Sequence, residues 1–328
     1  MKKLYFVLVV LAMVASACQL GGVSQAEPTP IPLAATAVAK PTVIMNPTSG
    51  PQGGSAPDSG TTRVSSVDGM TQVYVPDGTF MRGGIDPDAT INETPATKIT
   101  VSGFWMDKVE VTNGMYLLCF QAGVCTLPHF FDKATQTDKT VVKSSSRQKY
   151  FNTPEFADYP VIYVTWSDAD TYCKWAGRRL PTEAEWEYSA RGSFPSLNTF
   201  PWGDEQPDNS LANFNNNTGD TVRVGSYPTG ASMFGILDLA GNVAEWVQDF
   251  YDVKYYDQSI TVDPSGPIRG TVAFMRVMRG GYWADNWKSL RVSYRTSMMG
   301  PDPSQLAGSE GYIGMSSNAV GFRCTADN

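Results

Sequence analysis

The stretch Gly177-Arg178-Arg179-Leu180-Pro181-Thr182-Glu183-Ala184-Glu185-Trp186-Glu187-Tyr188 joins two predicted helices in the middle of the chain. Upstream of it, apolar side chains recur at helical spacing after Thr165, which predicts a helix that ends at the first glycine of the stretch. Thr182 and Glu185 have the spacing of a capping box. A second helix is therefore expected to begin there and to stop at Gly192.

Short strands and turns are expected on both sides of these helices. Three stretches have strand character: 72–78, 98–101 and 103–107. Thr112 or Asn113 caps a further helix that runs to Gln121. Beyond Gly192 no long helix is expected, because Gly, Asn and Pro recur among short aromatic-rich segments. The sequence therefore predicts one α+β domain with little regular secondary structure.

The composition excludes several classes of protein. With 328 residues, of which 42% are hydrophobic and 12% aromatic, the chain can bury a sizeable core. A net charge of −7 and a pI near 4.8 argue against binding to nucleic acid, which favours a basic surface. The sole histidine is His129, so a histidine-rich iron or zinc site is impossible, and we expect this residue to be structural.

The first residues have the layout of a secretory signal. Lys2 and Lys3 precede the apolar run 4–14, which is too short for a permanent membrane span. The small residues 15–17 then lead into Cys18. In one interpretation this is a bacterial lipobox, and Cys18 becomes an acylated N-terminus that anchors the protein in a membrane. In the other, the signal is cleaved and the protein is secreted. We favour the lipoprotein, held at the cell envelope outside the cytoplasmic membrane.

The rest of the chain divides into a linker and a domain. Residues 1–18 are interpreted as the signal peptide and 19–65 as a disordered stalk, because that segment is rich in Pro, Ala, Thr, Gly and Ser and has almost no aromatic residues. Residues 66–328 form the predicted domain. No stretch after the signal is long and apolar enough to cross a membrane.

Four further cysteines are expected to form disulfides, because an even number in an exported domain is typical of cystine cross-links. They are Cys119, Cys125, Cys173 and Cys324. Of the possible pairings, Cys119 with Cys125 would close a short local loop, which leaves Cys173 for Cys324. Free thiols or a metal site are the alternatives, but no CxxC spacing is present to favour zinc.

Several motifs occur in an order typical of one family: Val75-Pro76-Asp77-Gly78-Thr79-Phe80, Lys108-Val109-Glu110-Val111-Thr112-Asn113, the 177–188 stretch, Pro201-Trp202-Gly203, Gly241-Asn242-Val243-Ala244-Glu245-Trp246, Arg279-Gly280-Gly281 and Gly321-Phe322-Arg323-Cys324. Together they resemble the formylglycine-generating enzymes, also called sulfatase-modifying factors, over about residues 70–328. The resemblance implies an irregular α+β fold of the C-type-lectin-like kind. It also implies the pairing of Cys173 with Cys324.

The resemblance implies two calcium sites. The first would use Asn213, the carbonyl of Phe214, Asp220 and the carbonyl of Val222. The second would use Asp238, the carbonyls of Gly241 and Val243, and Glu245. Carboxylate, amide and carbonyl oxygens are the ligands that Ca²⁺ takes. The alternative for the second site is that its two carboxylates bond to backbone amides in a tight loop.

The family's catalytic cysteines are absent. In the formylglycine-generating enzymes a pair of cysteines binds Cu(I) and serves the oxidation of a substrate cysteine, and a serine follows the Arg-Gly-Gly turn. The matching positions here are Asp285 and Leu290, and Tyr282 replaces the serine. A carboxylate is a hard ligand and leucine is none, so copper is not expected.

A ligand surface is expected on the loops after the Arg-Gly-Gly turn, where aromatic and polar side chains alternate. Its candidate residues are Tyr282, Trp283, Asp285, Asn286, Trp287 and Arg291. Trp283 and Arg291 could instead pack and pair within the fold. The favoured function is a non-catalytic binding or scaffolding module for an envelope or extracellular protein, peptide or glycan. The alternative is a formylglycine-generating or divergent oxidase acting on a protein cysteine.

Overall fold

A computed structural model of the chain describes residues 56–132, 137–140, 150–151, 153–258, 260–270, 272, 274–301 and 314–328, and only the backbone of 129–132 and 137–140. The predicted signal peptide, Cys18 and most of the predicted stalk lie outside the described residues. So does the side chain of His129.

The described residues contain three α-helices: α1 (Asn113–Gln121), α2 (Trp166–Trp175) and α3 (Glu183–Arg191). Each begins after a threonine whose hydroxyl accepts a hydrogen bond from a backbone N–H three residues further on, as Thr182 does from Glu185. The predicted helices and caps are therefore confirmed. None of these helices has the length and apolar character needed to cross a membrane.

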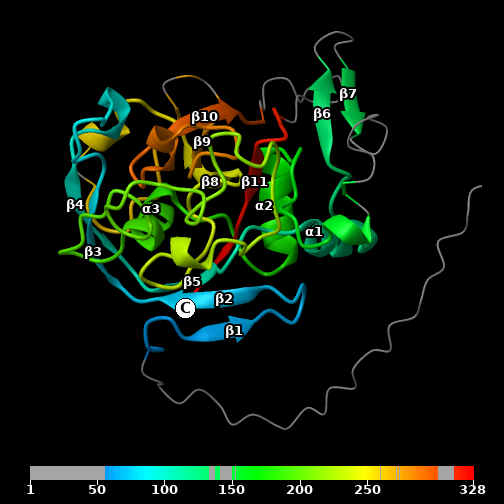
Figure 1. The fold of residues 1–328 in the computed structure, drawn as a ribbon, viewed down its shortest axis with the longest axis horizontal. Helices are drawn as coiled ribbons and strands as arrows, with labels where there is room; N and C mark the ends of the chain where they lie inside the picture. Colours follow the sequence, from blue (N-terminus) through cyan, green and yellow to red (C-terminus); the bar gives the residue numbers. More distant parts are fainter. Residues whose placement is uncertain are drawn as a thin grey trace, which may run out of the picture. The chain divides into compact units, whose positions relative to one another are not determined.

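Two four-stranded sheets supply most of the remaining regular structure (Figure 1). The first has the order β1 (Thr62–Val64), β2 (Thr71–Val75), β5 (Phe104–Asp107) and β12 (Thr325–Asp327). The second has the order β10 (Thr296–Met299), β9 (Met275–Arg279), β8 (Ala244–Phe250) and β11 (Val320–Phe322). Two hairpins pair β3 (Gly78–Arg82) with β4 (Thr97–Val101) and β6 (His129–Asp132) with β7 (Thr137–Thr140).

Beyond Gly192 the helical elements of the described residues are short 3₁₀ turns, as the sequence predicts. They are η4 (Pro228–Gly230), η5 (Tyr255–Asp257) and η6 (Trp287–Leu290), and η1 (Ile91–Glu93) and η3 (Pro154–Phe156) precede them in the chain. Loops held by hydrogen bonds connect these turns, which gives the irregular α+β architecture expected.

Helix α3 is buried along its whole length and lies against β3, β4, β8 and β9 (Figure 1). Its side chains Ala184, Trp186, Tyr188 and Ala190 join the second sheet in one hydrophobic cluster. Its charged side chains are also buried, and Glu183 and Glu187 both accept hydrogen bonds from Arg279 of β9, at 2.9 and 2.8 Å. Pairing is necessary there, because an unpaired charge is costly to desolvate.

The C-terminal segment joins the two sheets. β11 runs parallel to β8 in the second sheet, and β12 runs antiparallel to β5 in the first. Between them, Cys324 is bonded to Cys173 of α2, and a second disulfide joins Cys119 to Cys125. Of the possible pairings, the structure contains the one that the sequence analysis favoured.

One predicted boundary is wrong. Thr62–Val64, assigned to the stalk, form β1 and pair with β2, and Arg63 lies over the ring of Trp105 at 4.2 Å. The domain therefore includes residues before Ser66. Sequence patterning missed this strand because all three of its residues are exposed, so it lacks the alternation of apolar and polar residues that marks a half-buried strand.

Candidate functional site

The loop after β9 contains the positions where the family has its cysteines. Gly280 and Gly281 have φ angles of 92° and 67°, a region that favours glycine, and they turn the chain back from β9. Asn286 then caps η6 by accepting a hydrogen bond from the backbone N–H of Lys288 at 2.9 Å. The loop is thus a tight turn held by its own hydrogen bonds.

The two side chains at the cysteine positions differ in environment. The carboxylate of Asp285 accepts a hydrogen bond from the backbone N–H of Tyr282 at 3.3 Å, and burial raises the pKa of Asp285 to about 6. Leu290 is fully buried in a cluster with Phe200 and Phe214. These positions therefore offer one carboxyl group and one aliphatic side chain, which cannot replace a thiolate pair.

Aromatic side chains of the same loop lie partly exposed. Tyr282 and Trp283 contact each other edge to face with ring centroids 6.0 Å apart, and Trp283 donates a hydrogen bond to the carbonyl of Asn318 at 3.2 Å. Trp287 packs on the Leu290 cluster and keeps part of its surface exposed. We call residues 282–287 the loop surface.

Arg291 does not belong to this surface, so its assignment as a ligand-binding residue is wrong. Its guanidinium is buried and makes two hydrogen bonds of 2.8 Å to Glu93, with a third contact to Asp86 at 3.1 Å. Burial alone would raise the pKa of Glu93, but the hydrogen bonds from Arg291 hold that pKa below its usual range. Arg291 therefore ties η6 to η1.

The residues of the first predicted calcium site gather in one loop. The side-chain oxygen of Asn213 accepts a hydrogen bond from the Thr218 hydroxyl at 2.8 Å, and its amide donates to the carbonyl of Asp220 at 2.9 Å. The carbonyl of Phe214 accepts from the N–H of Asn217, and the carbonyl of Val222 accepts from the side-chain amide of Asn242 at 3.4 Å. These oxygens suit calcium in type, and the Asn213 oxygen keeps a second lone pair beside its hydrogen bond from Thr218.

The second predicted site has a different arrangement of charges. Asp238 accepts a hydrogen bond from the backbone N–H of Gly225 at 2.6 Å. Glu245 accepts hydrogen bonds from Arg323 at 2.6 and 2.7 Å and from the indole of Trp186 at 2.8 Å. Both oxygens of Glu245 already accept hydrogen bonds, and its charge is paired with Arg323, so about one acceptor position on this carboxylate is left for an ion. Calcium at the second site stays a sequence-based prediction.

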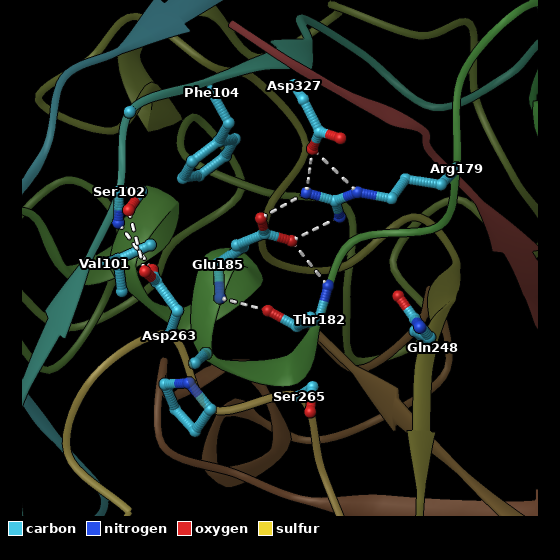
Figure 2. Close-up of a pocket in the computed structure, with 13 residues that line it drawn as sticks. Val101, Ser102, Phe104, Arg179, Thr182, Glu185, Gln248, Asp263, Ser265 and Asp327 are labelled. Atoms are coloured by element: carbon cyan, nitrogen blue, oxygen red, sulfur yellow. Dashed lines mark hydrogen bonds and ion pairs between the residues drawn. The ribbon is translucent and has the colours of Figure 1, made fainter.

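A cavity of about 410 Å³ lies elsewhere in the fold, and the sequence analysis did not predict it (Figure 2). It is formed by the β4–β5 turn, the start of α3, β8, the loop after Asp263 and β12. Its lining comprises Val101, Ser102, Gly103, Phe104, Arg179, Thr182, Ala184, Glu185, Gln248, Asp263, Pro264, Ser265 and Asp327. In the sequence, Thr182 and Glu185 have the pattern of a helix cap, and no local pattern marks Gln248 or Asp263 as residues that line a cavity.

Comparison with known proteins places the chain in a family. The model of the sulfatase-modifying factor enzyme 1-like domain matches residues 57–328, so the chain belongs to this family. The formylglycine-generating enzyme of Mus musculus is 32% identical over 293 residues, which cover 78% of this chain and 75% of that protein. The formylglycine-generating enzyme of Streptomyces coelicolor is 33% identical over 304 residues, which cover 78% of this chain and 89% of that protein.

Other relatives are longer or more distant. The serine/threonine-protein kinase Pkn1 of Chlamydia trachomatis is 34% identical over 256 residues, and this chain spans only 38% of its length. The structure of PvdO from Pseudomonas aeruginosa matches 83% of this chain and all of that chain, with a TM-score of 0.64 and 23% identity. This structural likeness supports the predicted α+β, C-type-lectin-like fold of the family.

Proposed function

We propose that this chain is an exported, lipid-anchored member of the family that acts at the cell envelope as a non-catalytic binding or scaffolding module. The observation that carries the proposal is the pair of side chains at the catalytic cysteine positions. Leu290 is fully buried and Asp285 is bonded to its own loop. All four cysteines of the domain are in disulfides, so none of them is free to bind Cu(I) as a thiolate.

In this proposal the loop surface binds the partner. Tyr282, Trp283 and Trp287 offer flat apolar faces beside the polar groups of Asp285 and Asn286, a combination that suits a peptide or a glycan. The signal-like residues 1–18 and Cys18 support export and acylation, which would hold the domain outside the cytoplasmic membrane.

A second candidate function is formylglycine generation. It is favoured by the whole-domain similarity to proteins with that name, since the enzyme of Mus musculus is covered over 75% of its length. In that reaction a substrate cysteine is oxidised to the aldehyde formylglycine.

One experiment separates the two candidates. The full-length protein is incubated in air with Cu(I), a thiol reductant and a cysteine-containing sulfatase peptide, and the peptide is analysed by mass spectrometry. We expect no aldehyde, while a formylglycine-generating enzyme as positive control converts the peptide. Conversion by this chain that survives removal of copper would point to a divergent oxidase. Conversion that requires copper would point to formylglycine generation, and conversion of either kind would overturn the binding-module proposal.

We further propose that calcium binds at the first predicted site, where Asn213 and Asp220 lie in one loop. An ion held by oxygens in the folded state alone raises stability by mass action. The melting temperature is therefore expected to fall when a chelator is added and to recover with excess Ca²⁺. Asp220→Asn should abolish that response, whereas Asp238→Asn leaves it intact if the second site plays no part. An unchanged melting temperature with chelator contradicts both sites.

A further inference from the structure

The cavity shown in Figure 2 has an excess of negative charge. Three carboxylates line it, those of Glu185, Asp263 and Asp327, and Arg179 is the one cationic side chain in the lining. The lining therefore has two more negative than positive groups. A cleft lined by one sign of charge and bounded by low-dielectric walls concentrates ions of the opposite sign.

Arg179 is already fully engaged within the protein. Its two terminal nitrogens donate to the carboxylate of Glu185 at 2.7 and 2.6 Å, and Nε and Nη2 donate to Asp327 at 3.0 and 2.7 Å. Nη1 also donates to the carbonyl of Leu180 and to the hydroxyl of Thr325. The guanidinium therefore has no donor left for an anionic ligand.

The backbone N–H groups at the start of α3 are also hydrogen-bonded within the protein. A helix N-terminus can bind an anion through its free N–H groups. Here the N–H of Thr182 donates to Glu185 at 2.8 Å, that of Glu183 to Asp249 at 2.8 Å, and that of Glu185 to the Thr182 hydroxyl at 3.1 Å. Carboxylates and a hydroxyl of the chain itself thus use these donors. The other side-chain donors in the lining, such as Gln248 and Ser265, are neutral, so the cavity offers an anion no free positive charge.

Among the described residues, Asp263 is the carboxylate of this lining that has no cationic partner, and it is exposed to solvent. Its two oxygens accept hydrogen bonds from the backbone N–H and the hydroxyl of Ser102, at 2.6 and 2.7 Å. A carboxylate can accept about four hydrogen bonds, so each oxygen retains capacity for a charged donor. Figure 2 shows Asp263 beside Ser102 on one side of the cavity, the Arg179–Asp327 pair on the other and Glu185 between them.

We infer that this cavity binds a small organic cation: a protonated primary amine or a guanidinium on a short apolar stem. Asp263 accepts the hydrogen bonds of the charged head, and Phe104, Ala184 and Pro264 contact the stem. A volume of about 410 Å³ lies within the range of ligand pockets in proteins. The inference is independent of the proposed function, because the cavity shares no residue with the loop surface.

Such a cation could be a free amine or a lysine side chain of a partner polypeptide. Isothermal titration of the full-length protein distinguishes these sources with two probes, cadaverine and a lysine-containing pentapeptide with blocked termini. The same peptide acetylated on its lysine Nζ serves as the neutral probe. We expect at least one cationic probe to bind, more weakly at raised salt, and the neutral probe not to bind.

The variant Asp263→Asn tests the contact itself. We expect it to weaken binding of the cationic probe about fivefold, which is the largest effect typical of losing one exposed ion pair. Asp204→Asn is the control, because Asp204 also accepts hydrogen bonds from the backbone N–H and the hydroxyl of one residue, Thr199, both at 2.8 Å and both at Oδ1, and it lies outside the cavity.

The outcomes are distinct. Tighter binding of the pentapeptide assigns the ligand to a polypeptide side chain, and tighter binding of cadaverine assigns it to a free amine. Equal binding of the acetylated and unmodified peptides, equal effects of the two variants, or no binding by either cationic probe overturns the inference. Melting curves of both variants establish that each is folded, and none of these outcomes bears on peptide oxidation or on the loop surface.

Discussion

Arg291 follows a partly exposed loop in the sequence, but its side chain is buried inside the domain. It lies next to the loop surface in sequence, but its guanidinium pairs with Glu93, which is fully buried. The pair joins residues 198 positions apart. Breaking a buried pair leaves one charge without a partner, which costs far more than losing an exposed pair.

Arg291→Met is therefore expected to lower the free energy of unfolding by about 3–5 kcal/mol, because Glu93 stays buried without its partner. Lys288→Met is the matched control: Lys288 lies in the same turn, and its pair with Asp88 at 2.6 Å is exposed. Its loss should cost at most about 1 kcal/mol. Urea unfolding at neutral pH measures both. Equal losses for the two variants would show that the buried Arg291–Glu93 pair contributes no more to stability than the exposed Lys288–Asp88 pair.

Asp249 provides a second test at the residue scale, in the pH dependence of stability. Burial, together with the charge of Glu183, raises the pKa of Asp249 to about 8. Its folded pKa thus exceeds the unfolded value of about 3.9. Below about pH 4, Asp249 is protonated in both the folded and the unfolded state, and stability is at its full value. As the pH rises towards 8, the free energy of unfolding falls, because Asp249 ionises more readily in the unfolded state.

Asp249→Asn keeps an acceptor for the N–H of Glu183 and cannot ionise. We expect the variant to be similar to the natural protein near pH 4 and increasingly more stable than it up to pH 8, by at most about 5 kcal/mol. Free energies of unfolding measured across that range test this expectation. Parallel curves for the two proteins would show that Asp249 is ionised in the folded state.

At the scale of elements, α3 organises the fold. It is the helix whose N-terminus borders the cavity and whose buried carboxylates receive Arg279 and Arg295. Its start is defined by reciprocal hydrogen bonds: Thr182 accepts from the N–H of Glu185 at 3.1 Å, and Glu185 accepts from the N–H of Thr182 at 2.8 Å. This cap holds Glu185 where Arg179 also reaches it.

Thr182→Ala is expected to lower the free energy of unfolding by about 1 kcal/mol, the typical cost of removing such a cap. Thr153→Ala is the control, because Thr153 precedes η3 but its side chain makes no capping hydrogen bond. Chemical denaturation compares the two variants. Equal losses would mean that the hydroxyl of Thr182 contributes nothing beyond the side chain itself.

At the scale of the whole molecule, the C-terminal segment connects elements that are distant in the chain. Residues 320–327 contribute one strand to each large sheet, and Cys324 binds α2 through Cys173. This disulfide spans 151 residues, whereas the Cys119–Cys125 disulfide spans 6. A cross-link that closes a longer loop removes more conformational entropy from the unfolded chain.

Replacing Cys173 and Cys324 by alanine should therefore destabilise the protein more than replacing Cys119 and Cys125. Chain entropy predicts losses of about 5 and about 2 kcal/mol for the two double variants. Urea unfolding of both variants, without reductant, gives the comparison. A larger loss for the short loop would indicate that packing around α1, and not loop closure, dominates.

The sequence alone determined the three helices, the caps Thr165 and Thr182 and the family, because these depend on signals within a few residues; the choice between Thr112 and Asn113 for α1 came from the structure. A hydroxyl at the cap, an acidic residue three positions later and a glycine at the end act locally, whatever the rest of the fold does. The motifs at 177–188 and 241–246 are equally local, so they could be recognised without knowledge of which segments contact one another.

Only the tertiary structure decided which charges meet and where a cavity opens. Ser102 and Asp263 are 161 residues apart, and Arg179 and Asp327 are 148 residues apart, so no local pattern brings these two pairs to opposite sides of one cavity. Tertiary structure likewise decides that Arg291 pairs with Glu93 and Arg323 with Glu245. These charges are buried, and a desolvated charge requires a partner of opposite sign beside it in the folded state. The same requirement buries the Arg291 side chain away from the loop surface. β1 is a different case: its three residues are exposed, and only their pairing with β2 shows that they belong to the domain.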